Sequence, residues 1–265
     1  MKRITINRNS KLKLLVYGKP GSGKTHFCGS LGLDERTTPV LHIDVAGNPI
    51  TLHKGLAKGA AIDVLQPEKL SDLNLVYDWL AAGQPLDKHL AKKFELTRQY
   101  KSLVFDGITG IQRDSFTETM GTADHGFADF FPKREYKHYG AVLQQMIHMA
   151  KLLYALDLHC VVTAQDHTQT RYTVPGDFST AFEYHYPLLE GEGKVEFPGY
   201  ALAVIRLVPI ATDVAKGKQL QAKYNYGSTE HNRYQYGKDQ HGFGIEAGLA
   251  DPTAAKLLDL LEEKR

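Results

Sequence analysis

The sequence contains few of the residues that mark secreted, metal-binding or membrane-spanning chains. Its only cysteines, Cys28 and Cys160, are too few and too isolated for a disulfide scaffold or a four-thiolate metal site. No window reaches about 18 uninterrupted apolar residues, and the basic N-terminus lacks the apolar core of a signal peptide. We therefore expect a cytoplasmic protein that neither enters the secretory pathway nor spans a membrane.

An excess of one charge sign is also missing. The chain has 32 Lys and Arg against 30 Asp and Glu, and a formal net charge of +2 is too small to indicate nucleic-acid binding by itself. The distribution is uneven, however, because residues 1–19 carry six basic residues and no acid, whereas residues 166–200 carry six acids and two basic residues. A bound polyanion is expected to avoid the second stretch.

The remaining composition is that of a folded globular protein, with 265 residues of which 42% are hydrophobic and 23% charged. Short apolar runs of strand length alternate with helical patterns. The expected strands cover residues 12–17, 40–44, 62–65, 103–106, 159–164 and 201–208, and the clearest helices cover 71–82 and 136–156. This alternation predicts an α/β fold with a mainly parallel sheet flanked by helices. We expect one domain over residues 1–265, with its core at about 11–210.

The last quarter of the chain changes character. Polar and aromatic residues alternate in 220–226 and 233–238 on either side of a turn-forming stretch, which predicts an antiparallel hairpin. Asp251 and Pro252 then predict the start of a C-terminal helix, with Asp251 as N-cap and Pro252 at the first helical position. The hairpin and this helix occupy about residues 211–265.

A Gly-rich loop between a predicted strand and a predicted helix carries the strongest motif. Residues 18–25 read GKPGSGKT, a full match to the G-x-x-x-x-G-K-[ST] phosphate-binding pattern. Lys24 is expected to reach the β- and γ-phosphates, and Thr25 to offer its hydroxyl to Mg²⁺. The residues expected to hold the nucleotide are Gly18, Lys19, Pro20, Gly21, Ser22, Gly23, Lys24, Thr25 and His26.

A second anion should help Thr25 to hold the magnesium, and Asp106 at the end of the apolar run SLVFD suits that role. The alternative is a strand-end cap or turn residue. Hydrolysis also needs a group that orients water. Asp106 is followed by Gly107, so the Asp-Glu pair of many ATPases is absent, and Asp44 is the candidate from the neighbouring strand. Gln165 ends another strand and is expected to sense the γ-phosphate, unless it only caps backbone groups.

Tyrosines interleaved with basic residues are the composition expected of a single-stranded nucleic-acid platform. The candidate residues are Lys223, Tyr224, Tyr226, Arg233, Tyr234 and Tyr236. The alternative is that this face packs on the core or on a neighbouring subunit. The aromatic loop 113–139 is a second candidate, as a lid, an oligomer contact or a DNA loop. The twelve histidines show no metal-ligand spacing, so we interpret them, like Cys28, as structural.

In this order the motifs resemble the RecA-type ATPases, and most closely the compact phage ATP-binding proteins related to the Sak-type single-strand annealing recombinases. The resemblance runs over roughly residues 11–245. It is carried by residues 18–25, 40–44, 102–113, 139–142, 161–167, 187–200 and 236–239. It implies a RecA-like P-loop NTPase core that binds ATP with Mg²⁺, uses Gln165 as sensor and forms a ring or filament. In such an assembly Lys238 would reach the nucleotide of a neighbouring subunit.

Two departures from the family pattern affect turnover rather than binding. Ala46 stands where the family usually has an acidic residue, and Gln240 stands where it usually has arginine. We therefore expect a weak ATPase that acts on single-stranded DNA in phage-type recombination or replication, in the host cytoplasm if the chain is phage-encoded. The alternative is an ATP-dependent protein-interaction switch or assembly factor that does not bind DNA. Small-molecule phosphotransfer is a third and weaker option.

Overall fold

The computed structural model describes residues 11–45, 59–85, 93–96, 98–121, 135–211, 222–232 and 235–264, without the side chains of 210, 211 and 222–226. The secondary-structure elements within these ranges are β1 (Lys13–Gly18), α1 (Lys24–Ser30), η1 (Leu31–Leu33), β2 (Val40–Asp44), β3 (Ile62–Leu65), α3 (Leu70–Ala81), β4 (Ser102–Asp106), α5 (Ile108–Thr119), α6 (Tyr136–Ala155), β5 (His159–Tyr172), η3 (Phe178–Thr180), β6 (Ala181–Pro187), α7 (Gly193–Tyr200), β7 (Ala203–Ala211), β8 (Ala222–Ser228), β9 (Lys238–Asp239), β10 (Leu249–Ala250) and α8 (Ala254–Glu263).

The described strands join into one sheet in the order β10-β8-β7-β1-β5-β4-β2-β3. From β7 to β3 the strands run parallel, whereas β8 and β10 continue the sheet in antiparallel pairing. Strands β1, β2 and β4 are buried along their whole length, as their near-continuous apolar sequences predict for a sheet covered on both faces. The expected α/β fold with a mainly parallel sheet is confirmed.

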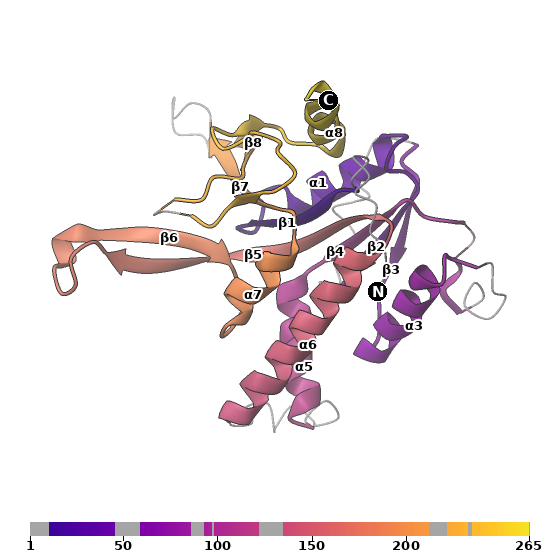
Figure 1. The fold of residues 1–265 in the computed structure, drawn as a ribbon, viewed down its shortest axis with the longest axis horizontal. Helices are drawn as coiled ribbons and strands as arrows, with labels where there is room; N and C mark the ends of the chain where they lie inside the picture. Colours follow the sequence, from indigo (N-terminus) through magenta and orange to yellow (C-terminus); the bar gives the residue numbers. More distant parts are fainter. Residues whose placement is uncertain are drawn as a thin grey trace, which may run out of the picture.

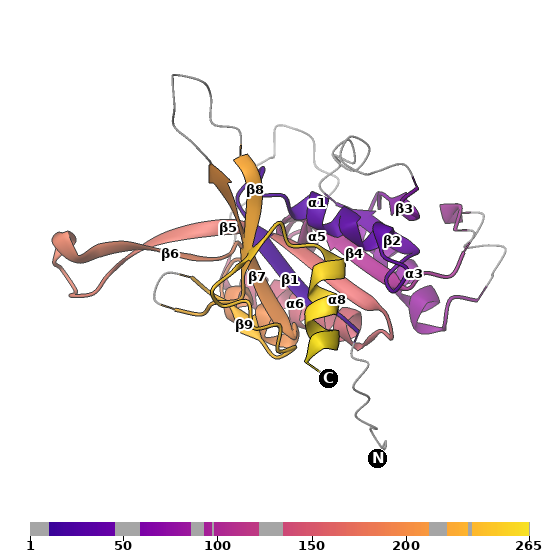
Figure 2. The same ribbon diagram turned by 90° about the horizontal axis from the view of Figure 1, so that it is seen from above.

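Helices cover both faces of this sheet (Figures 1 and 2). Helices α3, α5, α6 and α7 pack on one face, with buried Leu15, Phe105 and Met146 in the same core. Helices α1 and α8 pack on the other face, with Val16, Phe27 and Leu257. Side chains of neighbouring positions in β1 therefore enter different cores, as the two-residue period of a strand requires. None of the helices in the described ranges has the length and apolarity that crossing a bilayer requires.

The antiparallel strands expected at the C-terminal end are confirmed, but the expected pairing of residues 220–226 with 233–238 is wrong. Strand β8 pairs with β7 over residues 206–211, and the short β9 pairs with β7 at residues 203–204, so both lie along the same edge of β7 rather than against each other. The expected cap of the last helix is also wrong. Thr253 is the N-cap of α8 and accepts a hydrogen bond from the amide of Lys256, whereas Asp251 lies in a left-handed turn at φ 46°.

Strand β5 is much longer than the apolar run that predicts it. Beyond residue 165 it leaves the sheet core and pairs with β6 as an antiparallel ribbon that projects from the body of the molecule (Figure 1). The ribbon pairs residues 166–172 with residues 181–187. Residues 166–172 are mostly polar and show no alternation of apolar and polar residues from which a strand could be predicted, whereas Phe182, Tyr184 and Tyr186 do alternate with polar residues in β6.

The first residues of β1 are held by two histidines. The amide of Leu12 donates to Nδ1 of His159 at 3.1 Å, and the amide of Lys13 donates to Nε2 of His241 at 3.0 Å. A ring nitrogen that accepts a hydrogen bond carries no proton, so the structure requires both rings to be neutral. Burial lowers the pKa of each imidazole to about 4.

We predict that the free energy of unfolding falls as the pH is lowered from about 6.5 towards 4. In that interval the unfolded imidazoles bind protons that the folded ones exclude, which costs at most about 1.4 kcal/mol per pH unit for each histidine. Urea unfolding at a series of pH values measures the slope. His159→Asn, which cannot titrate, should make the slope shallower, and a stability that stays constant over this interval would contradict the assignment.

Candidate nucleotide-binding site

The loop between β1 and α1 folds back over the end of its own strand. A Cβ at Gly18 would lie 2.5 Å from the carbonyl oxygen of Leu207, so no larger residue fits there. Gly23, which immediately precedes α1, has φ 89°, a left-handed value that glycine adopts at little cost. The expected helix start near Gly23 is confirmed, because α1 begins at Lys24.

Lys24 points its ammonium group into this loop. Its Nζ donates to the carbonyl oxygens of Gly18 at 2.8 Å and Lys19 at 3.1 Å. Burial lowers the pKa of Lys24, while the nearby carboxylate of Asp106 acts in the opposite direction. The cation is therefore held at the loop, where a phosphate chain would replace the weaker carbonyl partners with full charges.

Asp106, Thr25 and Thr163 converge at the carboxyl end of β4, next to β5. The hydroxyl of Thr25 donates to Oδ2 of Asp106 at 3.1 Å, and the hydroxyl of Thr163 donates to Oδ1. Thr163 also accepts a hydrogen bond from the amide of Gly107 at 2.9 Å, and so holds the backbone that follows the carboxylate. A hydroxyl and a carboxylate oxygen beside a phosphate loop are the hard oxygen ligands that Mg²⁺ prefers. The donor set thus fits the expected metal, which when bound would offset the phosphate charge.

Burial by itself would raise the pKa of Asp106. Contacts with His42, Thr163 and Thr25 outweigh this effect and hold the pKa below the ordinary carboxyl value. His42 lies in β2 with 1% of its surface exposed, and its Nε2 is 3.5 Å from Oδ2 of Asp106. Asp106 is therefore ionised in a largely buried site, where its charge is available to hold a metal ion. Thr163 and His42 are the residues of this cluster that sequence reasoning did not single out as functional.

Asp44 ends β2 beside this cluster, whereas the expectation that Gln165 ends its strand is wrong, because β5 continues to Tyr172. Asp44 is in register with Asp106, is buried, and accepts a hydrogen bond from Nε2 of Gln66 at 3.1 Å. Gln165 is in register with Gly18, at the point where β5 passes from the central sheet into its pairing with β6, and Gln165 is exposed. Water orientation by Asp44 and phosphate sensing by Gln165 stay predictions.

A buried charged network follows the sensor position, and sequence reasoning missed it. Oδ2 of Asp166 lies 3.2 Å from Nη2 of Arg206 and 3.2 Å from Nδ1 of His185. Arg206 also donates to the side-chain oxygen of Gln235 at 3.1 Å. Burial lowers the pKa of His185, as does the neighbouring Arg206 cation. The network therefore connects β5, just after Gln165, to the ribbon strand β6 and to β7.

Other predicted residues are placed as follows. The ammonium of Lys238 donates to the carbonyl of Gly199 at 2.6 Å within the same chain, so the expected action on a neighbouring nucleotide stays a prediction. Tyr236 is half-buried, and its ring packs edge-on against His231. The candidates Arg233 and Tyr234 and the departure at Ala46 lie outside the described residues, as do the side chains of Lys223, Tyr224 and Tyr226.

The aromatic loop 113–139 is described only at its two ends. Phe116 is buried on α5 and packs edge-on against Tyr139 of α6, with ring centroids 5.0 Å apart. Phe116 therefore contributes to the core and exposed Tyr139 covers it, while residues 122–134 lie outside the described part. Cys28 is fully buried and burial raises the pKa of its thiol, which suits a structural residue. Across the described ranges no three His, Cys, Asp or Glu side chains gather as metal ligands.

Comparison with known proteins identifies this phosphate-loop arrangement. A family model described as AAA domain matches residues 10–240 of the chain. Curated proteins give no match. The matched segment contains the loop at 18–25, Asp106, Thr163 and the network around Asp166, and it ends before α8.

We predict that Thr163→Val weakens binding of the magnesium–nucleotide complex by about tenfold, because it removes both hydrogen bonds that orient Asp106 and Gly107. Valine keeps the shape of the side chain, so that the fold should be retained. Thr163→Ser keeps the hydroxyl and is expected to bind like the wild type. Titration calorimetry with MgATP measures the difference, and equal affinity of the valine variant and the wild type would contradict the role.

Proposed function

The chain belongs to the AAA domain family of P-loop ATPases, and on that premise we propose that it acts on single-stranded DNA in phage-type recombination or replication. In this proposal it binds ATP with Mg²⁺, hydrolyses it slowly and assembles with further copies of itself in the cytoplasm of the host. We further propose kinship with the phage Sak-type annealing proteins. Nucleotide binding is supported by the convergence of Lys24, Thr25 and Asp106 at one end of the parallel sheet.

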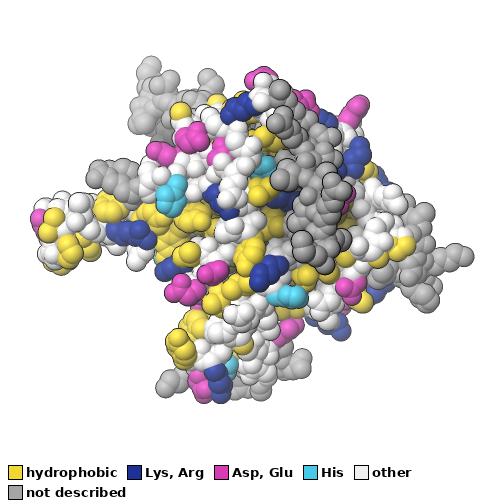
Figure 3. Space-filling model, viewed as in Figure 1, with side chains coloured by type: hydrophobic (Ala, Val, Ile, Leu, Met, Phe, Trp, Pro, Cys, Tyr) yellow, Lys and Arg dark blue, Asp and Glu magenta, His cyan; other side chains and the backbone are white. Residues whose placement is uncertain are grey.

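One face of the projecting ribbon supports the DNA part of the proposal. In the antiparallel register, His167, Gln169 and Arg171 of β5 share a face with Phe182, Tyr184 and Tyr186 of β6. Figure 3 shows hydrophobic surface and basic side chains side by side along this arm.

The rings and cations of this face form a continuous row. The Arg171 guanidinium lies 3.6 Å from the ring centroid of Tyr184, whose ring lies 5.9 Å from that of Tyr186. The ring centroids of Tyr186 and His167 are 5.0 Å apart, and the ammonium of Lys194 lies 5.6 Å from the ring centroid of Tyr186. Aromatic rings and cations in one row offer stacking to bases and charge to the backbone of a single strand.

The two acidic residues of the paired ribbon strands, Asp166 and Glu183, do not lie on that face. Asp166 is turned into the buried network with Arg206, and Glu183 lies on the opposite face with its side chain 67% exposed. The charge of the stretch 166–200 therefore overstates the repulsion that a polyanion would meet along the row.

The tip of the same ribbon favours the second candidate, an ATP-dependent protein-interaction switch. Phe178 is 78% exposed and Val174 is 52% exposed, and Tyr172 packs edge-on against Phe178. An apolar tip on a projecting arm is a feature of protein contacts rather than of phosphate recognition.

We predict that Lys24→Ala abolishes binding of ATP and leaves the fold intact, because the loop loses the only charge that points into it from α1. Titration calorimetry measures the affinity and circular dichroism the fold. Lys101→Ala is the matched control, since Lys101 caps the carbonyl of Glu35 and should bind ATP normally. Unchanged affinity of the Lys24 variant would refute the site.

We predict that Arg171→Ala and Tyr186→Ala each weaken binding to labelled single-stranded DNA by roughly tenfold, within the range of about 1–3 kcal/mol for loss of a stacked base. Arg171→Ala should also reduce the dependence of affinity on salt. Tyr136→Ala is the control, because Tyr136 is 93% exposed at the start of α6, away from the ribbon.

Fluorescence polarisation over a salt series, with and without ATP, measures this binding. Absence of binding by the wild type at low salt in both states would reject the DNA role and favour the interaction switch. If all three variants bind single-stranded DNA equally tightly, this face of the ribbon is not the DNA-binding surface.

A further inference from the structure

The position of Asp106 indicates how a triphosphate chain would be oriented along the nucleotide-binding loop. Thr25 and Asp106 meet on the side of β1 that faces β5 and β4, so the terminal phosphates and their metal belong there. The nucleoside at the other end of a triphosphate chain must then leave the loop on the side of β7. The inference below concerns that end and rests on the proposed binding of ATP.

A small cleft lies on the β7 side of the loop. It is formed by His26 and Phe27 of α1, Leu207 of β7, and Asp251 and Pro252 of the turn between β10 and α8. Its volume of about 50 Å³ admits the edge of a ring rather than a whole nucleoside. Phe27, Leu207 and Pro252 are buried and make its inner wall apolar, whereas His26 and Asp251 are exposed at its mouth.

Asp251 occupies its position in a strained conformation. Its φ of 46° lies in the left-handed region, which residues with a Cβ adopt at a cost and which recurs at ligand-binding positions. The backbone on each side of it is fixed. The ammonium of Lys256 donates to the carbonyl of Asp251 at 2.9 Å and to that of Ala250 at 2.8 Å, and Ala250 pairs with Tyr226 of β8.

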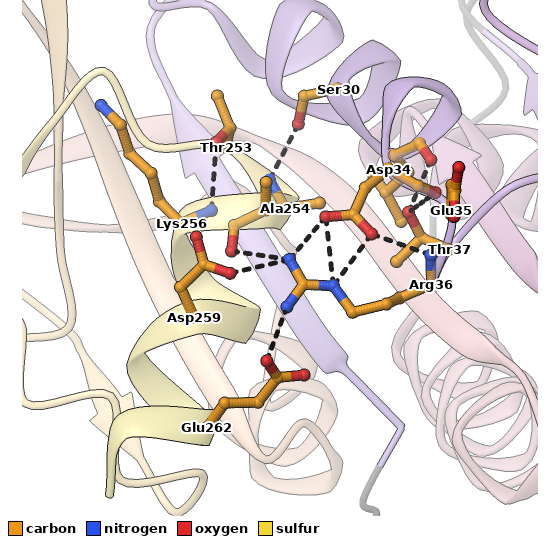
Figure 4. A network of polar contacts seen from close by, with 12 residues as sticks. Ser30, Asp34, Glu35, Arg36, Thr37, Thr253, Ala254, Lys256, Asp259 and Glu262 are labelled. Carbon is orange, nitrogen blue, oxygen red and sulfur yellow. Dashed lines mark hydrogen bonds and ion pairs between the residues drawn. The ribbon is translucent and has the colours of Figure 1, made fainter.

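The turn that carries Asp251 is attached to the helix that follows the loop. The amide of Ala254 donates to the hydroxyl of Ser30 at 2.9 Å. Arg36 then connects the segment after α1 to α8 (Figure 4), because its guanidinium lies 2.6 Å from Asp34, 2.8 Å from Asp259 and 3.1 Å from Glu262. The two walls of the cleft, α1 on one side and the turn before α8 on the other, are therefore fixed relative to each other.

We infer that this cleft receives the nucleoside end of the bound triphosphate, with Asp251 as a specificity-determining residue. A carboxylate can only accept hydrogen bonds, and the groups that can donate to it are the sugar hydroxyls and the amino group of the base. The Pro252 ring and Leu207 contact the edge of the sugar or base. The triphosphate itself has no donor for Asp251 and is repelled by it, so Asp251 favours nucleotides over inorganic polyphosphate.

The test compares Asp251→Asn with the wild type by titration calorimetry against MgATP, its 2′-deoxy analogue and inorganic tripolyphosphate. Asparagine tolerates left-handed backbone, and Asp251→Gly removes the side chain without strain, so that both variants should fold. Each is expected to bind ATP about tenfold more weakly and tripolyphosphate as tightly as the wild type or tighter. Glu263→Gln, an exposed substitution at the end of α8, is the matched control.

Loss confined to ATP would assign the contact to the 2′-hydroxyl, and equal loss for the deoxy analogue would assign it to the base or the 3′-hydroxyl. Both results support the inference. A variant whose ratio of ATP to tripolyphosphate affinity equals that of the wild type, including one that binds both ligands more weakly by the same factor, would overturn the inference. Failure of the wild type to bind either ligand is a different outcome, because it overturns the proposed function first and the inference with it.

Discussion

Strand β1 is hydrogen-bonded in parallel to β5 on one side and to β7 on the other, so that Gly18 lies beside both Gln165 and Leu207. Three chain segments that are far apart in the sequence therefore meet beside the phosphate loop. A slip of β5 by one residue would turn its side chains to the other face of the sheet. Thr163 would then leave Asp106 and enter the core on the opposite side, and Asp106 would lose the hydroxyl that orients it.

The phosphate loop and Asp106 could be predicted from the sequence because each depends on a short run of residues. The glycine pattern lies between a strand and a helix, and the aspartate ends an apolar strand. Each can therefore be recognised from the residues next to it. Thr163 and His42 could not be recognised in this way. Their contacts with Asp106 depend on which strands become neighbours and on the register between them, and the chain separates Asp106 from Thr163 by 57 positions.

The errors at the C-terminal end have a related cause. Alternation of polar and aromatic residues indicated β8 correctly, whereas among the described residues of 233–238 only Lys238 belongs to a strand, β9. The residues between the two suggested a local turn, but β8 and β9 both pair with the free edge of β7. The sequence 251–253 likewise suggests a cap at Asp251, although Thr253 takes that role and leaves Asp251 in the turn. A charge sum over the stretch 166–200 also takes no account of strand alternation and burial, which place Asp166 in a buried network and Glu183 on the opposite face of the ribbon from Tyr184.

The packing of α8 against α1 affects which boundaries an expression fragment can have. Residues 10–240 match the family model, but Leu257 and Leu258 of α8, beyond that segment, are buried in the same core as Phe27 and Leu31. An expression fragment trimmed to the matched boundaries would expose this apolar surface next to the phosphate loop. Such a fragment would be prone to aggregate, and its failure in a binding assay would report on the missing helix rather than on the loop.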